Sequence, residues 1–229
     1  MIFQKILSQH YKEKISAKIE ISAFIADDAK IGQNCYIGHN VVIEAGTKIG
    51  DNCVIMHNSV ILRNCMIGNN VTIGCNNTIG NYGFGYEKNE HGEQSLLQHI
   101  GNVQIHDNVE IHNNTCIDRA VLGSTIVEEN VKIDNQVHIA HGVHIMKNSL
   151  IIANALIAGS VKVGENSWIG PTSTIKNQLK LAAGTLTGLG SVVTKDTDEN
   201  SVMVGNPAIT LEEYKEWSTF RKNLTKDKK

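Results

Sequence analysis

Isoleucine recurs at every sixth position over the first third of this sequence. The series starts at Ile19 and reaches Ile79 through eleven isoleucines without a gap. A helix brings residues three or four apart to one face, and a simple strand brings residues two apart to one face. A period of six suits neither, but it suits a triangular coil in which each side contributes one inward aliphatic residue and about 18 residues complete a turn. The period therefore predicts an all-β chain folded as a left-handed parallel β-helix of hexapeptide repeats.

The rhythm breaks twice. After Gly80 the segment "NYGFGYEKNEHGEQSLLQHIGN" has no sixfold pattern, and the period returns at Ile105. The segment "DRAVLGST" then shifts the phase by four, and aliphatic residues follow at six from Val127 to Leu181. We therefore expect the β-helix to span residues 17–208, with a loop insertion at residues 81–102.

The other repeat positions agree with this fold. Four residues after most isoleucines stands a small or β-branched residue, and Cys35, Cys53 and Cys65 occupy this position. These thiols are expected to fill the core and not to bind a metal. Glycines follow many isoleucines and asparagines crowd the next positions, and both residue types tolerate the positive φ that a corner demands.

Both ends of a solenoid need a cap, because the terminal coils expose apolar groups and unpaired strand edges. We expect an N-terminal capping helix at residues 1–16, where apolar residues stand at helical spacing. At the other end, Thr210 and Glu213 form a T-x-x-E capping box. It predicts a C-terminal helix and tail at residues 209–229. The apolar residues at helical spacing behind the box are Leu211, Tyr214, Trp217 and Leu224.

Composition excludes several classes of protein. The net charge is −2 and the pI is about 6.5, without the basic stripe of a nucleic-acid-binding protein. No apolar stretch reaches the ~18 residues of a membrane span, and the N-terminus lacks the features of a signal peptide. The five cysteines form no CxxC pair. We expect a cytoplasmic protein with reduced thiols, no metal site, no nucleic-acid partner and no membrane span.

The segment "HIAHGV" carries two histidines on an otherwise apolar framework. Parallel β-helices of this repeat are usually homotrimers that transfer acyl groups at sites between subunits, which is an analogy at the level of the fold. An amine acceptor loses a proton as it attacks a thioester, and a neutral imidazole is the best-matched base near pH 7. His138 and His141 are therefore candidates for a general base. The alternative is a pair of polar residues at a solvated corner.

The coil period places other residues beside His141. Gly159 stands one full coil further along, at the same corner, where a substrate could approach the backbone closely. The Gly159 N–H is a candidate oxyanion donor. One more coil brings Asn177, beside Gln178, to the same groove.

Several segments resemble a known enzyme family. They are "GNYGFGY", "VEIHNNTCIDRAVLGSTIV", "VKIDNQVHIAHGV" and "LIAGSVKVGENSWIG". They resemble the UDP-3-O-(3-hydroxyacyl)glucosamine N-acyltransferases of lipid A biosynthesis, from about residue 67 to 193. "HIAH" also resembles the related UDP-N-acetylglucosamine O-acyltransferases. Both resemblances imply that His141 is the base, and the first implies that Gly159 supplies the oxyanion amide.

Three features depart from the N-acyltransferase pattern. That family begins with a nucleotide-gripping domain, whereas the coils here start near residue 17, so we expect that domain to be missing. Gln178 stands where the family has a histidine. The coils end with "SVMVGNPA", which resembles the closing segment of hexapeptide acetyltransferases that use acyl-CoA. This resemblance implies acyl-CoA as the donor, with acetyl-CoA first. The residues assigned to the donor are Asn177, Gln178, Gly188, Gly205, Asn206 and Pro207.

We therefore expect a homotrimeric N-acyltransferase that acts on a nucleotide-linked amino sugar in surface polysaccharide biosynthesis. The residues assigned to the acceptor are Phe84, Gly85, Tyr86, Asn135, Gln136 and His138. One alternative is a lipid A-type enzyme whose partner is a 3-hydroxyacyl-acyl carrier protein. Another is a non-catalytic β-helical assembly protein. A metal site of the γ-carbonic-anhydrase kind would need a third histidine beside His138 and His141, and the "IAH" context disfavours it.

Overall fold

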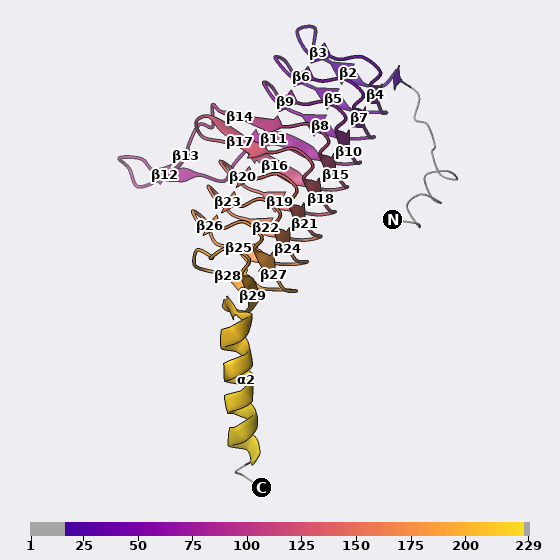
Figure 1. Ribbon diagram of the computed structural model, residues 1–229. Coiled ribbons are helices and arrows are strands. Elements are labelled where there is room, and N and C mark those ends of the chain that lie inside the picture. The colour runs from indigo at the N-terminus through magenta and orange to yellow at the C-terminus, as the bar shows by residue number, and fades with distance from the viewer. Residues whose placement is uncertain (1–16, 227–229) are drawn as a thin grey trace, which may run out of the picture.

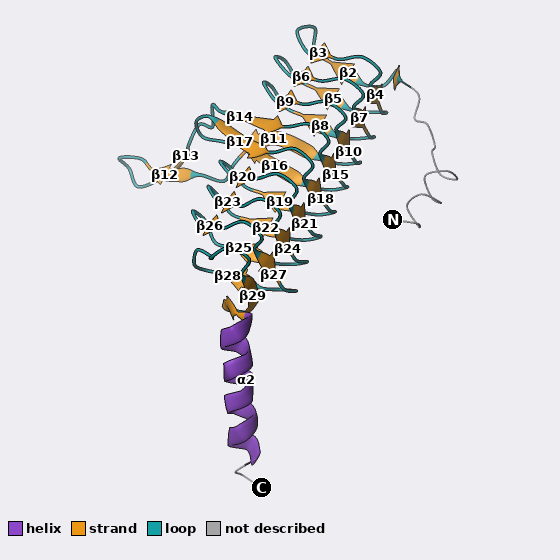
Figure 2. Cartoon of the chain, in the orientation of Figure 1, coloured by secondary structure: helices purple, strands orange, loops and turns teal. Residues whose placement is uncertain are grey.

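The chain winds into a parallel β-helix of about ten coils, which confirms the predicted fold class (Figure 1). The structure is a computed structural model and describes residues 17–226. The N-terminal helix predicted for residues 1–16 lies outside the described residues. Three parallel sheets form the sides of the prism, and short strands alternate with corners throughout (Figure 2).

The first sheet ends in an antiparallel pair, β29 and β30. Its strands are β1 (Lys18–Ile19), β4 (Tyr36–Ile37), β7 (Val54–Ile55), β10 (Thr72–Ile73), β15 (Glu110–Ile111), β18 (Lys132–Ile133), β21 (Leu150–Ile151), β24 (Trp168–Ile169), β27 (Leu186–Thr187), β29 (Val202–Gly205) and β30 (Ala208–Thr210). The second sheet contains β2 (Phe24–Ile25), β5 (Val42–Ile43), β8 (Val60–Ile61), β11 (Thr78–Tyr82), β16 (Cys116–Arg119), β19 (His138–Ile139), β22 (Leu156–Ile157), β25 (Thr174–Ile175) and β28 (Val192–Val193). The third contains β3 (Lys30–Ile31), β6 (Lys48–Ile49), β9 (Met66–Ile67), β14 (Asn102–Ile105), β17 (Ser124–Val127), β20 (His144–Ile145), β23 (Lys162–Val163) and β26 (Lys180–Leu181).

The strand register follows the predicted coil period. Ile19 pairs with Ile37, and Ile37 pairs with Ile55. The isoleucines of the sixfold series are buried from Ile37 onward in one continuous core, which Cys35, Cys53 and Cys65 help to fill as predicted. Burial raises the pKa of the Cys53 and Cys65 thiols to about 11, so these thiols stay protonated and apolar in character.

Corner geometry corrects the prediction about the glycines. Asparagine occupies most of the positive-φ positions, for example Asn34 and Asn52, each at 57°. Gly32 and Gly50 are not among the positive-φ glycines. A Cβ on Gly32 would lie 2.6 Å from the backbone carbonyl carbon of Gly50, in the next coil. These glycines therefore serve the close stacking of coils, and the asparagines beside them supply the left-handed conformation.

Both breaks of the period lie at the same edge of the prism, between the second and third sheets. Ile73 pairs with Ile111, so this coil contains many more residues than a regular one. The extra residues form the first insertion, between β11 and β14. Ile117 pairs with Ile139, again across more than a regular coil, which places the second insertion between β16 and β17. Residues 81–102, predicted as a loop, contain a hairpin of β12 (Tyr86–Lys88) and β13 (Gln94–Leu96) that projects from this edge (Figure 1).

A buried arginine ties the two insertions to the coils. Arg119 is 2% exposed and its guanidinium donates to three backbone carbonyls. Its Nε lies 2.6 Å from Gly80 O, Nη1 lies 3.4 Å from Gly101 O, and Nη2 lies 3.1 Å from Arg63 O. The guanidinium also stands over the Tyr82 ring, 5.4 Å from its centroid. These carbonyls belong to the two coils before that of Arg119, so Arg119 joins three successive coils and fixes the base of the projecting hairpin.

The chain ends in helix α2 (Leu211–Lys226), as the capping box predicts. Thr210 N–H donates to Glu213 Oε2 at 2.8 Å, and Glu213 N–H donates to Thr210 Oγ1 at 3.1 Å. The helix continues away from the last coil instead of lying across its end (Figure 1), and Trp217 is half-exposed. The buried Met203 and Ala208, from β29 and β30, complete this end of the core.

Candidate active site

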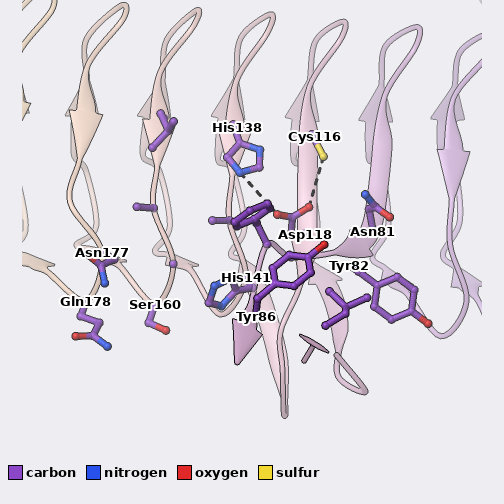
Figure 3. Close-up of a pocket in the computed structure, with 17 residues that line it drawn as sticks. Asn81, Tyr82, Tyr86, Cys116, Asp118, His138, His141, Ser160, Asn177 and Gln178 are labelled. Carbon is purple, nitrogen blue, oxygen red and sulfur yellow. Dashed lines mark hydrogen bonds and ion pairs between the residues drawn. The ribbon is translucent and has the colours of Figure 1, made fainter. Parts of the chain in front are cut away.

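Three predicted residues stack along the edge that carries both insertions. His141, Gly159 and Asn177 each lie at the start of the corner that follows a strand of the second sheet, namely β19, β22 and β25. Backbone hydrogen bonds join successive corners, from Ser160 N to His141 O and from Gln178 N to Gly159 O, both at 2.9 Å. The structure therefore brings these residues together as the coil period predicts, and Figure 3 shows His141 and Asn177 along this edge.

The His141 ring lies directly against the backbone of Gly159. A Cβ on Gly159 would stand 2.7 Å from Cε1 and 2.8 Å from Nε2 of the imidazole. Real Cβ atoms essentially never approach another atom so closely. Only glycine at this position leaves the imidazole room to lie over the corner.

The Gly159 amide lacks a partner that several other corners have. At those corners the N–H of the first corner residue donates to a side chain, as from Gln33 to Asp51, from Asn69 to Asp107 and from Asn113 to Asn135. In the described part of the chain, the Gly159 N–H has no hydrogen-bond partner. An unpaired amide beside an imidazole can bind an oxygen that develops negative charge.

A cavity of about 690 Å³ opens over this edge. Its walls include His141 and Gly159 from the coils and Phe84, Tyr86 and Leu96 from the hairpin. The further residues that line it are Asn81, Tyr82, Gly83, Cys116, Asp118, His138, Ala140, Leu156, Ala158, Ser160, Asn177 and Gln178. Its size is that of a small-molecule site.

The hairpin offers aromatic groups to this cavity. Phe84 is 87% exposed, Tyr86 is also exposed, and their ring centroids lie 5.0 Å apart. Gly85 does not line the cavity, and a Cβ there would stand 3.2 Å from Cε1 of His99. The two rings are therefore available to a ligand, whereas Gly85 allows the loop to pass close over His99.

An acid that the sequence pattern did not single out lies at the base of the cavity. Asp118 is buried, and its Oδ2 lies 3.7 Å from His138 Nε2 (Figure 3). Burial raises the pKa of the Asp118 carboxyl above its ordinary value, and the nearby imidazoles offset only part of this rise. Cys116 Sγ lies 3.6 Å from Asp118 Oδ1, and burial raises the thiol pKa to about 12. The signal in the sequence was an acid directly after the core residue Ile117, where the second insertion begins.

The environment of His141 favours its neutral form. Burial is the largest cause that lowers the pKa of the imidazole below its ordinary value, and repulsion from the neighbouring His99 is the second. The Asp118 carboxylate opposes these effects. A neutral imidazole has a free nitrogen lone pair, so His141 can accept a proton near pH 7.

Two predicted acceptor residues lie elsewhere. Asn135 and Gln136 form the corner between β18 and β19, which is a different edge of the prism from the cavity. Asn135 Oδ1 accepts from Asn113 N–H at 3.0 Å, and Gln136 takes a φ of 59°. Within one subunit they do not line the cavity, so their role in acceptor binding stays a prediction that needs a second subunit.

The predicted donor residues are also divided. Asn177 and Gln178 line the cavity of His141. Gly205, Asn206 and Pro207 line a separate cavity of about 360 Å³ near helix α2, together with Tyr214 and Trp217. Gly188 lines neither of these two cavities, although a Cβ there would stand 3.2 Å from Val204 Cγ1, near the second one.

Metal clusters and membrane-spanning helices are both absent from the described residues. Within residues 17–226, no group of three or more histidine, cysteine, aspartate or glutamate side chains is arranged to hold a metal ion. No helix in the same range has the apolar length that crossing a membrane requires.

Known proteins share this repeat and fold. Residues 46–81 match the family described as bacterial transferase hexapeptide (six repeats). A UDP-N-acetylglucosamine acyltransferase from Bacteroides fragilis is similar over 84% of this chain and 73% of its own, with 26% identity and a TM-score of 0.76. The enzyme of that name from Campylobacter jejuni has 24% identity over the same shares and a TM-score of 0.75. The Arabidopsis enzyme has 23% identity, again over 84% and 73%, and a TM-score of 0.70. No curated protein matches the chain.

Residues 46–81 carry the bacterial transferase hexapeptide repeat, and the fold is that of solved acyltransferases. Both findings agree with the acyltransferase activity that the sequence predicts. The solved structures named above are UDP-N-acetylglucosamine acyltransferases. The more specific resemblance to the N-acyltransferases of lipid A biosynthesis is not among these matches and stays a prediction.

Proposed function

We propose that this protein transfers an acyl group from a thioester to a nucleotide-linked amino sugar, with His141 as the general base. The observation that carries the proposal is the contact between the His141 imidazole and Gly159, whose N–H is free, at the wall of a cavity of about 690 Å³. Base, oxyanion donor and room for a reacting carbonyl then lie at one corner. These are the parts that acyl transfer to a nucleophile requires.

The proposed reaction has two steps. His141 accepts the proton of the acceptor amine as its nitrogen attacks the thioester carbonyl carbon. The carbonyl oxygen takes the electron pair and is stabilised by the Gly159 N–H. When the carbonyl reforms, the carbon–sulfur bond breaks and the thiolate leaves, taking a proton from the His141 imidazolium. The products are the amide and the free thiol.

The donor we favour is acyl-CoA, with acetyl as the acyl group. The chain supports this choice through its "SVMVGNPA" segment, whose Gly205, Asn206 and Pro207 line the second cavity. An acyl carrier protein thioester is the alternative donor. The aromatic pair Phe84 and Tyr86 would contact the acceptor.

A hydroxyl acceptor is the second candidate, because the similar solved structures are named UDP-N-acetylglucosamine acyltransferases. The same base and amide would serve it, since a hydroxyl must also lose a proton as it attacks. The acceptor amine is favoured by the resemblance in "VKIDNQVHIAHGV", and only the acceptor atom differs between the two candidates.

The test is a matrix of donors and acceptors. Amino-sugar nucleotides and UDP-N-acetylglucosamine are each incubated with acetyl-CoA, longer acyl-CoA and acyl carrier protein thioesters. Mass spectrometry of the sugar nucleotide then reports the transferred acyl group. Because a positioned base contributes about 10²–10⁴-fold, His141→Ala should lower kcat by that factor with an unchanged melting temperature. A His141→Ala enzyme with wild-type turnover at neutral pH would show that the base assignment is wrong.

A further inference from the structure

A second histidine lies behind the candidate base. His99 comes from the end of the 81–102 insertion and is only 1% exposed. Its Nδ1 lies 2.7 Å from the Leu97 carbonyl oxygen. A carbonyl oxygen only accepts hydrogen bonds, so Nδ1 carries the proton. The ring is thereby fixed in orientation and in tautomer.

The other nitrogen of this ring has no partner. Among the side chains that the structure describes, His99 Nε2 is the only buried nitrogen or oxygen atom without a hydrogen bond. With the proton on Nδ1, Nε2 presents a bare lone pair.

The His99 and His141 rings are in contact across the edge of the cavity. Their centroids lie 5.3 Å apart with an interplanar angle of 77°, so one ring meets the other edge-on. A Cβ on Gly83 would stand 2.8 Å from His99 Nε2 and 2.8 Å from both Cβ and Cδ2 of His141. His99 Nε2 and this side of His141 therefore border the same small gap, and only a residue without a side chain fits there.

Three groups from different elements face His141. Asp118 comes from β16, His138 comes from β19, and His99 comes from the insertion. The Cε1 and Nε2 end of His141 lies over Gly159, whereas its Cβ and Cδ2 side lies against Gly83 and His99. One side of the base is thus left for the substrate and the other is closed by the insertion.

We propose that His99 is a positioning residue for His141. Its ring, anchored on the Leu97 carbonyl, holds the base over Gly159 and excludes water from the inner side of the imidazole. The insertion then contributes to the chemistry as well as to acceptor binding. This inference depends on the proposed function only in that His141 is the base.

The test measures the titration of His141 without any substrate. Histidine-labelled protein is followed by NMR against pH, and the His141 signal is identified by its loss in His141→Ala. His99→Ala admits water to the base, so the His141 pKa should rise toward its ordinary value. His99→Phe keeps the ring volume and still excludes water from the base, so the His141 pKa should stay close to the wild-type value. Gly83→Ala drives the two rings apart and should act like His99→Ala.

Kinetics supply the second measurement. His99→Ala should lower kcat by about 10–100-fold, as expected for a misplaced base, with little change in the acceptor KM. His99→Phe should lower kcat by less than His99→Ala does. A His141 titration that is the same in wild type and in folded His99→Ala would overturn the inference. So would a rise of the His141 pKa in His99→Phe equal to that in His99→Ala.

The two proposals fail separately in this design. If no donor and acceptor pair reacts but the titrations shift as described, the proposed function is wrong and the coupling of His99 to His141 stands. If acyl transfer requires His141 but His99→Ala changes neither the titration nor kcat, the function stands and the role of His99 is wrong.

Discussion

Replacing Gly159 by alanine tests the contact on which the proposed site is built. The added Cβ would stand 2.7 Å from Cε1 and 2.8 Å from Nε2 of His141, whereas ordinary contacts begin at 3.4 Å. The imidazole must therefore retreat by more than half an ångström from the Gly159 corner. Gly159 is not among the positive-φ glycines, so alanine is not strained by a left-handed backbone there.

A displacement of this size has a large effect on a base. Misplacing a catalytic group by about 1 Å can lower a rate by about 10²-fold. Gly159→Ala keeps its backbone N–H, so the oxyanion donor is retained and the loss reports the position of the imidazole. We expect kcat to fall by up to about 10²-fold. The melting temperature should stay close to that of wild type, because the three closest atoms to the new Cβ all belong to the His141 ring.

A double-mutant cycle gives the control. In His141→Ala the ring is gone, and the added Cβ of Gly159→Ala meets none of the atoms that it would otherwise strike. The double variant should therefore be no slower than His141→Ala alone, and the two losses should be strongly non-additive. If Gly159→Ala keeps the wild-type kcat, or if the two losses in kcat add, His141 does not act as the base in the position where it contacts Gly159.

Three further outcomes are expected. The ascending limb of the kcat/KM profile should lie below pH ~6.5, the ordinary histidine value, because burial lowers the pKa of His141 and the neutral base persists to lower pH. This limb should vanish in His141→Ala. A limb that persists in that variant belongs to the acceptor amine. Replacing both Phe84 and Tyr86 by alanine should raise the acceptor KM far more than the donor KM, and equal effects on the two would show that the hairpin is only a connection. Sedimentation should give about three times the chain mass of 25.1 kDa, because a site shared between subunits requires a closed threefold assembly; a stable monomer at micromolar concentration would contradict the shared site.

The fold could be predicted from sequence because each hexapeptide repeats the same local structure, one inward aliphatic residue in a short strand followed by a corner. Ile37 and Ile55 face the same core for the same reason, so one correct period fixes every coil. The same arithmetic placed Gly159 and Asn177 beside His141, since no break of phase separates them. It also shows why Asn135 lies at another edge, because it stands one hexapeptide before His141 and therefore one corner earlier.

The parts of the site that escaped prediction lie where the period fails. No repeat relates His99 to His141, so their contact depends on how the insertion folds back onto the coils. Asp118 directly follows Ile117, at the buried position that Ala140 holds in the next coil, and the second insertion begins there. Periodicity gives the place of Asp118 but does not indicate that an acid there belongs to the site, and it does not place His99 at all.

The breaks of the period supply what a regular solenoid lacks, namely the walls of a cavity. A regular coil presents the same shallow corner at every turn. The amides of many such corners donate to neighbouring side chains. Here two successive coils are lengthened at one edge, and Arg119, from the second of them, donates to carbonyls of the two coils before its own. The projecting hairpin then supplies the wall, and the free Gly159 amide lies one coil beyond His141. Both breaks lie at the edge where the cavity opens, so two adjacent coils depart from the repeat beside it.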